Sequence, residues 1–177
     1  SANDELPSLR LAERLILESM DLDLPVIGHC LGGQLMARAL GARIGPAPAP
    51  EIGWQSLTVA DSDEARSWFG DTAQHTVFQW HHEAFELPRG TRALAHSAAC
   101  PNQAFAIGPH LAMQFHVELD AAKLAFWSAS DDPDYLRLQS DCASVQSGEQ
   151  MRAQAAQALG VQQALADRLY RRWLGGA

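Results

Sequence analysis

The stretch LPVIGHCLGGQ, residues 24–34, decides the fold. Its first four residues form a short, continuous apolar run that stops at Gly28, which is typical of a buried strand in a parallel sheet. A helix is predicted over Gly32–Leu40, and Gly41 is a natural C-terminal cap for it. The stretch therefore predicts a buried strand, a sharp turn around Cys30 and a helix.

Apolar residues at helical spacing predict a further helix on each side of this unit. The first runs from about Pro7 to Met20 and is amphipathic. The second covers about residues 148–175, where apolar side chains recur three to four residues apart. We expect this C-terminal helix to dock on the core.

The middle of the chain is predicted to form short strands joined by turns. Pro46–Pro50 favours a stiff, extended connector. Gly108-Pro109 is a turn signal that indicates a hairpin. Ser128–Ser147 is rich in Asp and Ser and is expected to wrap the surface. The predicted strands are Ser56–Val59, Thr76–Trp80, Arg92–Ala95, Ala104–Ile107 and Leu111–Phe115.

Composition predicts one folded domain over residues 1–177, because 47% of the residues are hydrophobic and the charged ones are spread out. A net charge of −8 without a basic stripe disfavours nucleic-acid binding. No run of about 18 apolar residues predicts a membrane span, and the polar, acidic start is not that of a secretory signal. Cys30, Cys100 and Cys142 form no C-x-x-C pair, so a disulfide scaffold or structural zinc is disfavoured and a cytoplasmic location is expected.

Cys30 is the candidate nucleophile. A nucleophile on a tight strand-to-helix turn is pushed out from the backbone, and glycines two residues to either side relieve the crowding. The helix N-terminus favours the thiolate, and the backbone N–H of Leu31 can point at a developing oxyanion. A lone cysteine in an apolar setting is more often an inert core residue, so the prediction depends on the flanking pattern G-x-C-x-G-x-Q.

His116 and Glu118 are the candidate base and the residue that orients it. They close the last predicted strand, and residues two apart on a strand share a face. The carboxylate would hold one imidazole nitrogen while the other faces the thiol, as in a catalytic triad. A solvent-facing H-x-E at a strand end is common by itself, so the prediction depends on its pairing with Cys30.

Other histidines offer weaker alternatives. His29 adjoins Cys30, but neighbouring side chains on a turn diverge, which makes it a poor candidate base. A metal site built from residues such as His29, Cys30, His81, His82 and His116 lacks H-x-x-x-H or C-x-x-C spacing, so none is predicted.

With these motifs in order, the chain resembles a class I glutamine amidotransferase domain, most like the stand-alone GMP-synthase-like type. The resemblance runs from Ser1 almost to the C-terminus, and several separate motifs in the right order make coincidence improbable. The matching segments are Gly28–Gln34, Glu51–Trp54, Gln79–His81, Phe85–Pro88, Ala95–Ser97, Asn102–Phe105 and Gln114–Glu118.

The resemblance implies an α/β fold: a three-layer, flavodoxin-like, doubly wound and mainly parallel sheet. It implies that the side-chain amide of glutamine is hydrolysed through a glutamyl thioester on Cys30, with no metal or organic cofactor. Gln34 resembles a residue near the substrate's amide end. The segment Gln79-Trp80-His81 resembles one whose backbone holds the substrate's α-amino and α-carboxylate groups. Without the family, Gln34 reads as an exposed helix residue and Trp80 as a core aromatic.

Three departures from the family pattern qualify the expectation. Val117 stands where the family usually has proline, and His29 replaces a small apolar residue and is expected to alter access to the thiol. The chain also starts after the Gly-Gly-Pro loop that gives the second oxyanion donor. It is therefore expected to be N-terminally truncated, lacking several strands, and losing one preorganised oxyanion donor costs about 100- to 1000-fold in rate.

Three functions follow as alternatives. The first is a glutaminase-type amidotransferase that delivers ammonia to an acceptor or synthetase on a separate chain. The second is a γ-glutamyl hydrolase that uses the same triad on γ-glutamyl compounds. The third is a catalytically impaired binding or regulatory module. A homodimer is possible under each of them.

Overall fold

The computed structural model describes residues 1–175. The helices are α1 (Pro7–Asp21), α2 (Leu31–Ala39), α3 (Asp63–Phe69), α4 (Ala121–Trp127), α5 (Pro133–Asp141) and α6 (Gly148–Trp173). The strands are β1 (Ile27–His29), β2 (Ile44–Val59), β3 (Gln74–Phe85), β4 (Ala95–His96), β5 (Ala104–Ile107) and β6 (His110–Met113).

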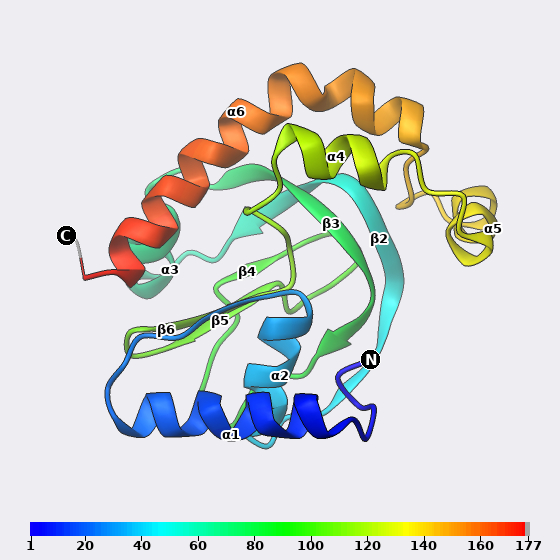
Figure 1. The fold of residues 1–177 in the computed structure, drawn as a ribbon. Helices are drawn as coiled ribbons and strands as arrows, with labels where there is room; N and C mark the ends of the chain where they lie inside the picture. The colour runs from blue at the N-terminus through cyan, green and yellow to red at the C-terminus, as the bar shows by residue number, and fades with distance from the viewer. Residues whose placement is uncertain (176–177) are drawn as a thin grey trace.

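The strands form one sheet in the order β1-β6-β5-β4-β2-β3. Strand β1 pairs with β6 in parallel, so their carboxyl ends lie at the same edge of the sheet. The other pairs are antiparallel, and the long β2–β3 ribbon curls away from the short strands (Figure 1).

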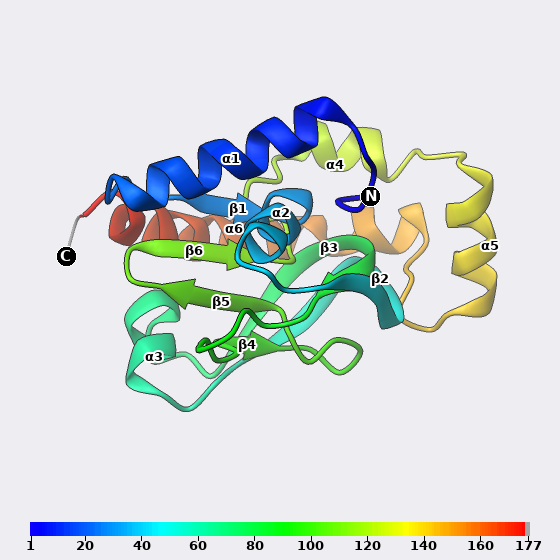
Figure 2. The ribbon, with the colours of Figure 1, turned by 90° about the horizontal axis from the view of Figure 1, so that it is seen from below.

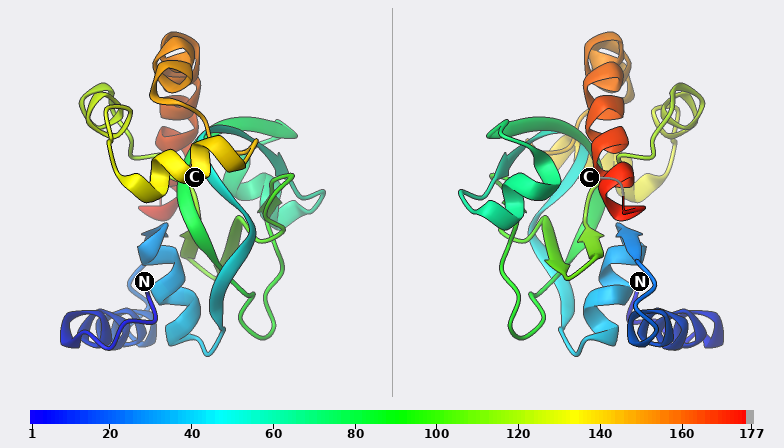
Figure 3. Two further views of the ribbon diagram at one scale, coloured as in Figure 1. Left: turned by 90° about the vertical axis from the view of Figure 1, so that its right-hand side faces the viewer. Right: turned by 90° about the vertical axis from the view of Figure 1, so that its left-hand side faces the viewer.

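Helices cover both faces of the sheet. Helices α1 and α2 lie on one side and α4 and α6 on the other (Figure 1), while α5 projects at one end of the molecule (Figure 2). In the side views, α1 and α2 lie beside the lower part of the sheet, and α6 lies toward the opposite end of the molecule (Figure 3). Separate apolar clusters fill the spaces beside the helices. Leu35, Met36 and Phe105 belong to the cluster under α1 and α2, whereas Trp68, Phe115 and Leu169 belong to the one under α3 and α6.

The α/β class and the predicted unit at residues 24–40 are confirmed, but the mainly parallel pairing is wrong for this chain. Among the strand pairs that the structure describes, only β1–β6 is parallel, and one isolated parallel bridge joins Ile52 to Val145. Crossover connections make parallel pairs, and the segment between β2 and β6 instead turns back repeatedly. Strand β1 also starts later than predicted, although the Leu111 N–H already bonds the Val26 carbonyl at 2.9 Å.

The proline-rich connector is part of β2 rather than a separate linker. Pro46 pairs with Glu83, and the register then shifts before Glu51. Along its other edge, β2 is paired with β4 only at Thr58 and Val59. Alternating prolines are tolerated there because a proline without a donor N–H fits an unpaired strand edge.

Residues 128–147 do more than wrap the surface. They include α5, and Tyr135 and Val145 are buried in a cluster with Trp54 and Met151. The expected strand at Arg92–Ala95 is reduced to β4. The predicted strand Ala104–Ile107, the hairpin at residues 108–109 and the C-terminal helix are confirmed.

Candidate active site

Cys30 occupies a strained turn between β1 and α2. Its φ of 44° and ψ of −107° are rare for a residue with a side chain, and such a conformation costs on the order of 1–3 kcal/mol. The Cys30 N–H donates to the Met113 carbonyl at 2.9 Å, which ties the turn to the end of β6.

Two glycines make this turn possible by close backbone approach. A Cβ at Gly28 would lie 2.6 Å from the Gly32 carbonyl carbon, and one at Gly33 would lie 2.4 Å from the Met113 carbonyl oxygen. A Cβ at Gly32 meets nothing within 4 Å. Glycine was predicted to relieve crowding at positions 28 and 32, two residues to either side of Cys30. The structure has no room for a Cβ at Gly28 and Gly33, whereas Gly32 has open space.

His116 and Glu118 lie beside Cys30 because β1 and β6 run in parallel. The chain leaves β6 at Met113, and the His116 N–H then donates to the Phe78 carbonyl at 2.9 Å. His116 Nδ1 lies 2.7 Å from Glu118 Oε1, and the Cys30 thiol and the Glu118 carboxylate both raise the pKa of the His116 ring. The predicted shared strand face is wrong, since this pair lies in a turn after the strand.

The electrostatics of the pair favour a charged imidazolium and carboxylate. Burial alone lowers the pKa of His116, but the hydrogen bonds and charges of Cys30 and Glu118 outweigh it and raise that pKa to about 9. Burial raises the pKa of Glu118, yet the opposing effect of His116 and His29 brings it to about 2. At neutral pH the arrangement holds His116 as a proton donor beside the thiol.

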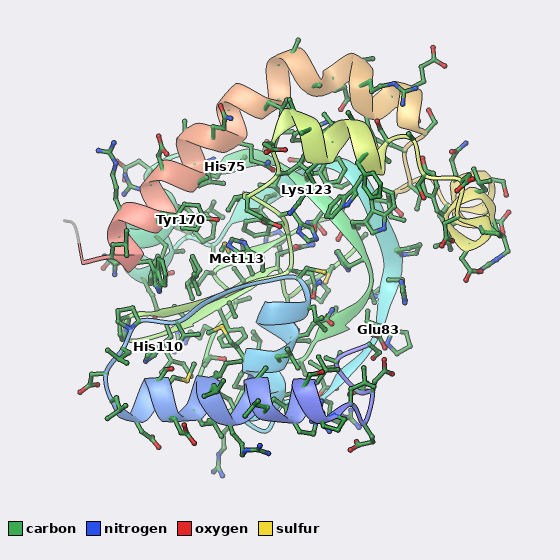
Figure 4. The ribbon with its side chains drawn as sticks, in the orientation of Figure 1. His75, Glu83, His110, Met113, Lys123 and Tyr170 are labelled. Carbon is green, nitrogen blue, oxygen red and sulfur yellow. The ribbon has the colours of Figure 1, made fainter. Side chains whose placement is uncertain are left out.

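A second histidine also faces Glu118. His29 Nδ1 lies 3.4 Å from Glu118 Oε2, and the Tyr170 hydroxyl of α6 lies 3.1 Å from His29 Nε2. Lys123 of α4 is 3.5 Å from Glu118 Oε1. Figure 4 shows Lys123 and Tyr170 on the same side of the sheet, above Met113. The sequence pattern indicated His29 as a poor candidate base and a substitution near the thiol, but pointed to neither Tyr170 nor Lys123.

Gln34 and Gln114 form a buried amide pair next to the nucleophile. Gln34 Nε2 donates to the Glu83 carbonyl at 3.0 Å and to Gln114 Oε1 at 3.3 Å. Gln114 Nε2 lies 3.7 Å from Cys30 Sγ. Gln34 is therefore not an exposed helix residue, and its amide nitrogen already has internal acceptors. The position of Gln114 next to the H-x-E motif was the available signal for it.

The segment Gln79–His81 reaches the site through its backbone. The Trp80 carbonyl lies 3.8 Å from Cys30 Sγ. The Gln79 side chain is buried elsewhere and donates to Gln103 Oε1 at 2.8 Å. His81 is also buried, with Nε2 3.3 Å from Glu51 Oε2. Of these three residues, only Trp80 thus approaches the thiol directly.

A pocket of about 340 Å³ opens beside the candidate base, lined by Trp80, Phe126, Trp127, Ala129, Ser130 and Asp131. The Trp127 ring lies edge-on to the His116 ring, with centroids 4.9 Å apart. Within residues 1–175, no three His, Cys, Asp or Glu side chains are grouped so that they could hold a metal ion. None of the helices in that range is both long and apolar enough to cross a membrane.

Comparison with known proteins places these residues in a family context. A solved glutamine amido transferase from Methylobacillus flagellatus superposes with a TM-score of 0.89 and 31% identity over 99% of this chain and 72% of its own. Gamma-glutamyl peptidase 3 of Arabidopsis thaliana is 36% identical over 52% of this chain and 40% of its own length. A glutamine-hydrolyzing GMP synthase subunit of Natronomonas pharaonis is 41% identical over 46% of this chain and 44% of its own.

The chain thus matches less than half the length of these last two relatives. The sequence profile of the family described as glutamine amidotransferase class-I matches residues 5–123, which include Cys30, His116 and Glu118. This match covers most of the chain and, together with the superposition, assigns its family. The chain belongs to the class I glutamine amidotransferases.

Proposed function

We propose that this chain hydrolyses the side-chain amide of glutamine through a thioester on Cys30. The observation that carries the proposal is the strained Cys30 turn beside a histidine whose Nδ1 lies 2.7 Å from Glu118 Oε1 and whose pKa the thiol and the carboxylate raise. Nucleophile, base and orienting group in hydrogen-bond contact are the arrangement that covalent acyl transfer requires.

The reaction divides into two balanced steps. The Cys30 thiolate attacks the amide carbon, and His116 donates its proton to the departing nitrogen, so that the C–N bond breaks and ammonia leaves. His116 then accepts a proton from water, whose oxygen attacks the thioester carbon. The C–S bond breaks, glutamate is released, and the thiolate and imidazolium are restored. Glu118 stabilises the imidazolium in the resting state and again after the second attack.

The oxyanion of each step needs donors fixed in advance. Leu31 is the first residue of α2, and the first N–H groups of a helix have no acceptor within their own helix. We therefore assign its N–H to the developing oxyanion. Gln34 acts indirectly through Gln114, and the backbone of Trp80 lies where a substrate in contact with Cys30 would pass.

The released ammonia is proposed to serve a synthetase or another acceptor on a separate chain. Support comes from the resemblance to a relative named as a subunit of GMP synthase. In this proposal the separate chain uses the ammonia, whereas the residues described above hydrolyse the amide.

Hydrolysis of γ-glutamyl compounds is the second candidate. The pocket beside His116 is supporting evidence, because an amine larger than ammonia needs space on the side where the leaving nitrogen is protonated. The similarity to gamma-glutamyl peptidase 3 also favours it. Both candidates use the same acylation chemistry and differ in the leaving group.

The test compares L-glutamine with γ-glutamyl amines and measures ammonia against free amine. Cys30→Ala is expected to abolish turnover of both, while Cys142→Ala serves as a matched control. A diazoketone analogue of glutamine should label Cys30 first, since burial raises the pKa of the Cys100 thiol to about 11. Turnover that survives in Cys30→Ala would disprove the nucleophile assignment, and equally slow labelling of all three cysteines would support a non-catalytic module.

A further inference from the structure

The carboxylate of Glu118 is contacted on both oxygens, and only one of them is used by the triad. Oε1 accepts from His116 at 2.7 Å, with Lys123 3.5 Å away. Among residues 1–175, Oε2 is buried with no hydrogen-bond partner, and so is His29 Nδ1, which lies 3.4 Å from it. Two buried polar atoms that face each other at this distance form a contact that a small movement would turn into a hydrogen bond.

The chemistry of this contact fixes the protonation of His29. An ionised carboxylate only accepts hydrogen bonds, so the ring nitrogen that faces it must carry a hydrogen. Burial lowers the pKa of His29 and, with the charges of His116 and Lys123, outweighs the Glu118 carboxylate and the Phe115 backbone, which raise it. A neutral ring with hydrogen on Nδ1 has an acceptor at Nε2, and the Tyr170 hydroxyl can donate to it at 3.1 Å.

The contacts connect two distant parts of the chain. Tyr170 lies on α6, 141 residues from His29 along the sequence. Its ring packs edge-on against the His29 ring, with centroids 5.9 Å apart. Leu169, its neighbour on α6, is fully buried in the core, so the helix that carries the hydroxyl is held firmly against the sheet.

We propose that His29 is a positioning residue for the triad and that Tyr170 fixes its ring. Its Nδ1–H holds Glu118 Oε2, which prevents the carboxylate from rotating and keeps Oε1 directed at His116. The docked C-terminal helix thereby sets the orientation of the base. This inference rests on the proposed thiol chemistry, since it concerns how Glu118 supports His116.

Four variants test it: His29→Leu removes the donor, His29→Asn replaces it with an amide N–H, Tyr170→Phe removes only the hydroxyl, and Tyr135→Phe is the matched control. Tyr135 bonds the Gln146 carbonyl, away from Glu118. With L-glutamine we expect His29→Leu to lower kcat about tenfold with KM little changed, because a hydrogen bond to a charged group is lost. His29→Asn should restore most of that loss, and Tyr170→Phe should lower kcat about threefold.

Two readouts do not require turnover. ¹⁵N NMR of the histidine rings near neutral pH should show His29 neutral with hydrogen on Nδ1, and Tyr170→Phe should shift it toward mixed tautomers. The alkaline midpoint of Cys30 alkylation by iodoacetamide should move to lower pH in His29→Leu and remain unchanged in Tyr135→Phe. The midpoint should move to lower pH because a less firmly held Glu118 carboxylate stabilises the His116 imidazolium less, which lowers the pKa of His116.

The outcomes separate the two proposals. If folded His29→Leu keeps the wild-type kcat and alkylation profile, or if His29 carries its hydrogen on Nε2, the positioning role is overturned. If instead Cys30→Ala retains turnover, the proposed function fails. Thermal unfolding of each variant distinguishes a folded, misoriented site from a protein that has lost its core.

Discussion

Replacing Glu118 with glutamine tests the electrostatic part of the proposed triad. The substitution keeps the shape of the side chain but removes the charge that lies 2.7 Å from His116 Nδ1. With the carboxylate, the pKa of His116 is about 9. Without it, burial acts to lower that pKa and Cys30 alone still raises it, so the pKa should fall toward its ordinary value of 6.5.

The expected magnitude follows from the protonation of His116. At pH 7.5, a pKa of about 9 leaves roughly nine-tenths or more of the imidazole protonated, whereas a pKa of 6.5 leaves about a tenth. The smaller fraction of protonated His116 alone therefore lowers kcat about tenfold. The amide can also present its NH₂ to Nδ1 and favour the wrong tautomer, and a comparable change in a serine-protease triad costs about 10⁴-fold. We expect kcat to fall by about 10²- to 10⁴-fold.

The assay is ammonia release from L-glutamine between pH 6 and 10, with Cys30 alkylation measured in parallel. Glu64→Gln on the exposed side of α3 is the matched control, since Glu64 lies in a first helical turn away from the site. A Glu118→Gln protein that folds, keeps kcat within about threefold and shows an unshifted pH profile would refute the reasoning.

Three further predictions concern stability. Because the folded-state pKa of His116 is raised to about 9, its contribution to the free energy of unfolding should be fully present below pH 6.5. That contribution, up to about 3 kcal/mol, should be lost as pH rises through 9; urea unfolding should show this fall, and His116→Gln should flatten it. Glu51→Ala should destabilise the fold by about 3 kcal/mol, because it removes the buried carboxylate that accepts from Gln103 Nε2 at 2.6 Å and faces His81 Nε2 at 3.3 Å. A loss below about 1 kcal/mol in chemical denaturation would contradict this. Gly33→Ala should lower both the melting temperature and Cys30 reactivity, because its Cβ would lie 2.4 Å from a backbone oxygen; Gly32→Ala, with open space, is the matched control, and equal effects of the two would exclude the steric explanation.

Local patterns in the sequence were sufficient to predict the turn that carries Cys30. The apolar run, the glycines and the following helix are all within about a dozen residues, and the structure places β1, the turn at Cys30 and α2 there. The C-terminal helix was also predictable, because its apolar spacing persists and Ser147 with Gln150 forms a capping box at its start.

Short or irregular elements were not predictable in the same way. Helices α3 and α4 have seven residues each, which is too few for a periodic pattern to stand out. The prolines at residues 46–50 argued against a strand, and only the tertiary pairing shows that one edge of β2 needs no donors there. Pairing direction likewise depends on the path of the whole chain, which explains why the mainly parallel sheet was not found.

The candidate site shows the same division between local and distant information. The pairing of His116 with Glu118 was predicted from a strand geometry that is absent, yet the two meet because a turn after β6 brings them together. Glu118 is contacted by His29, next to the nucleophile, and by Lys123 on α4, while Tyr170 on α6 contacts the far side of the His29 ring. No spacing rule joins those positions.

Cys30 and Glu118 are therefore expected to respond differently when the fold is loosened. Cys30 is fixed by short-range backbone contacts to β6, so its position depends little on the rest of the fold. The orientation of Glu118 depends on side chains from helices that pack on the sheet from one side. Loosening the docking of α6 should therefore impair the support of His116 before it displaces the thiol. Loss of the imidazolium with retention of an accessible Cys30 is the signature that this order of events predicts.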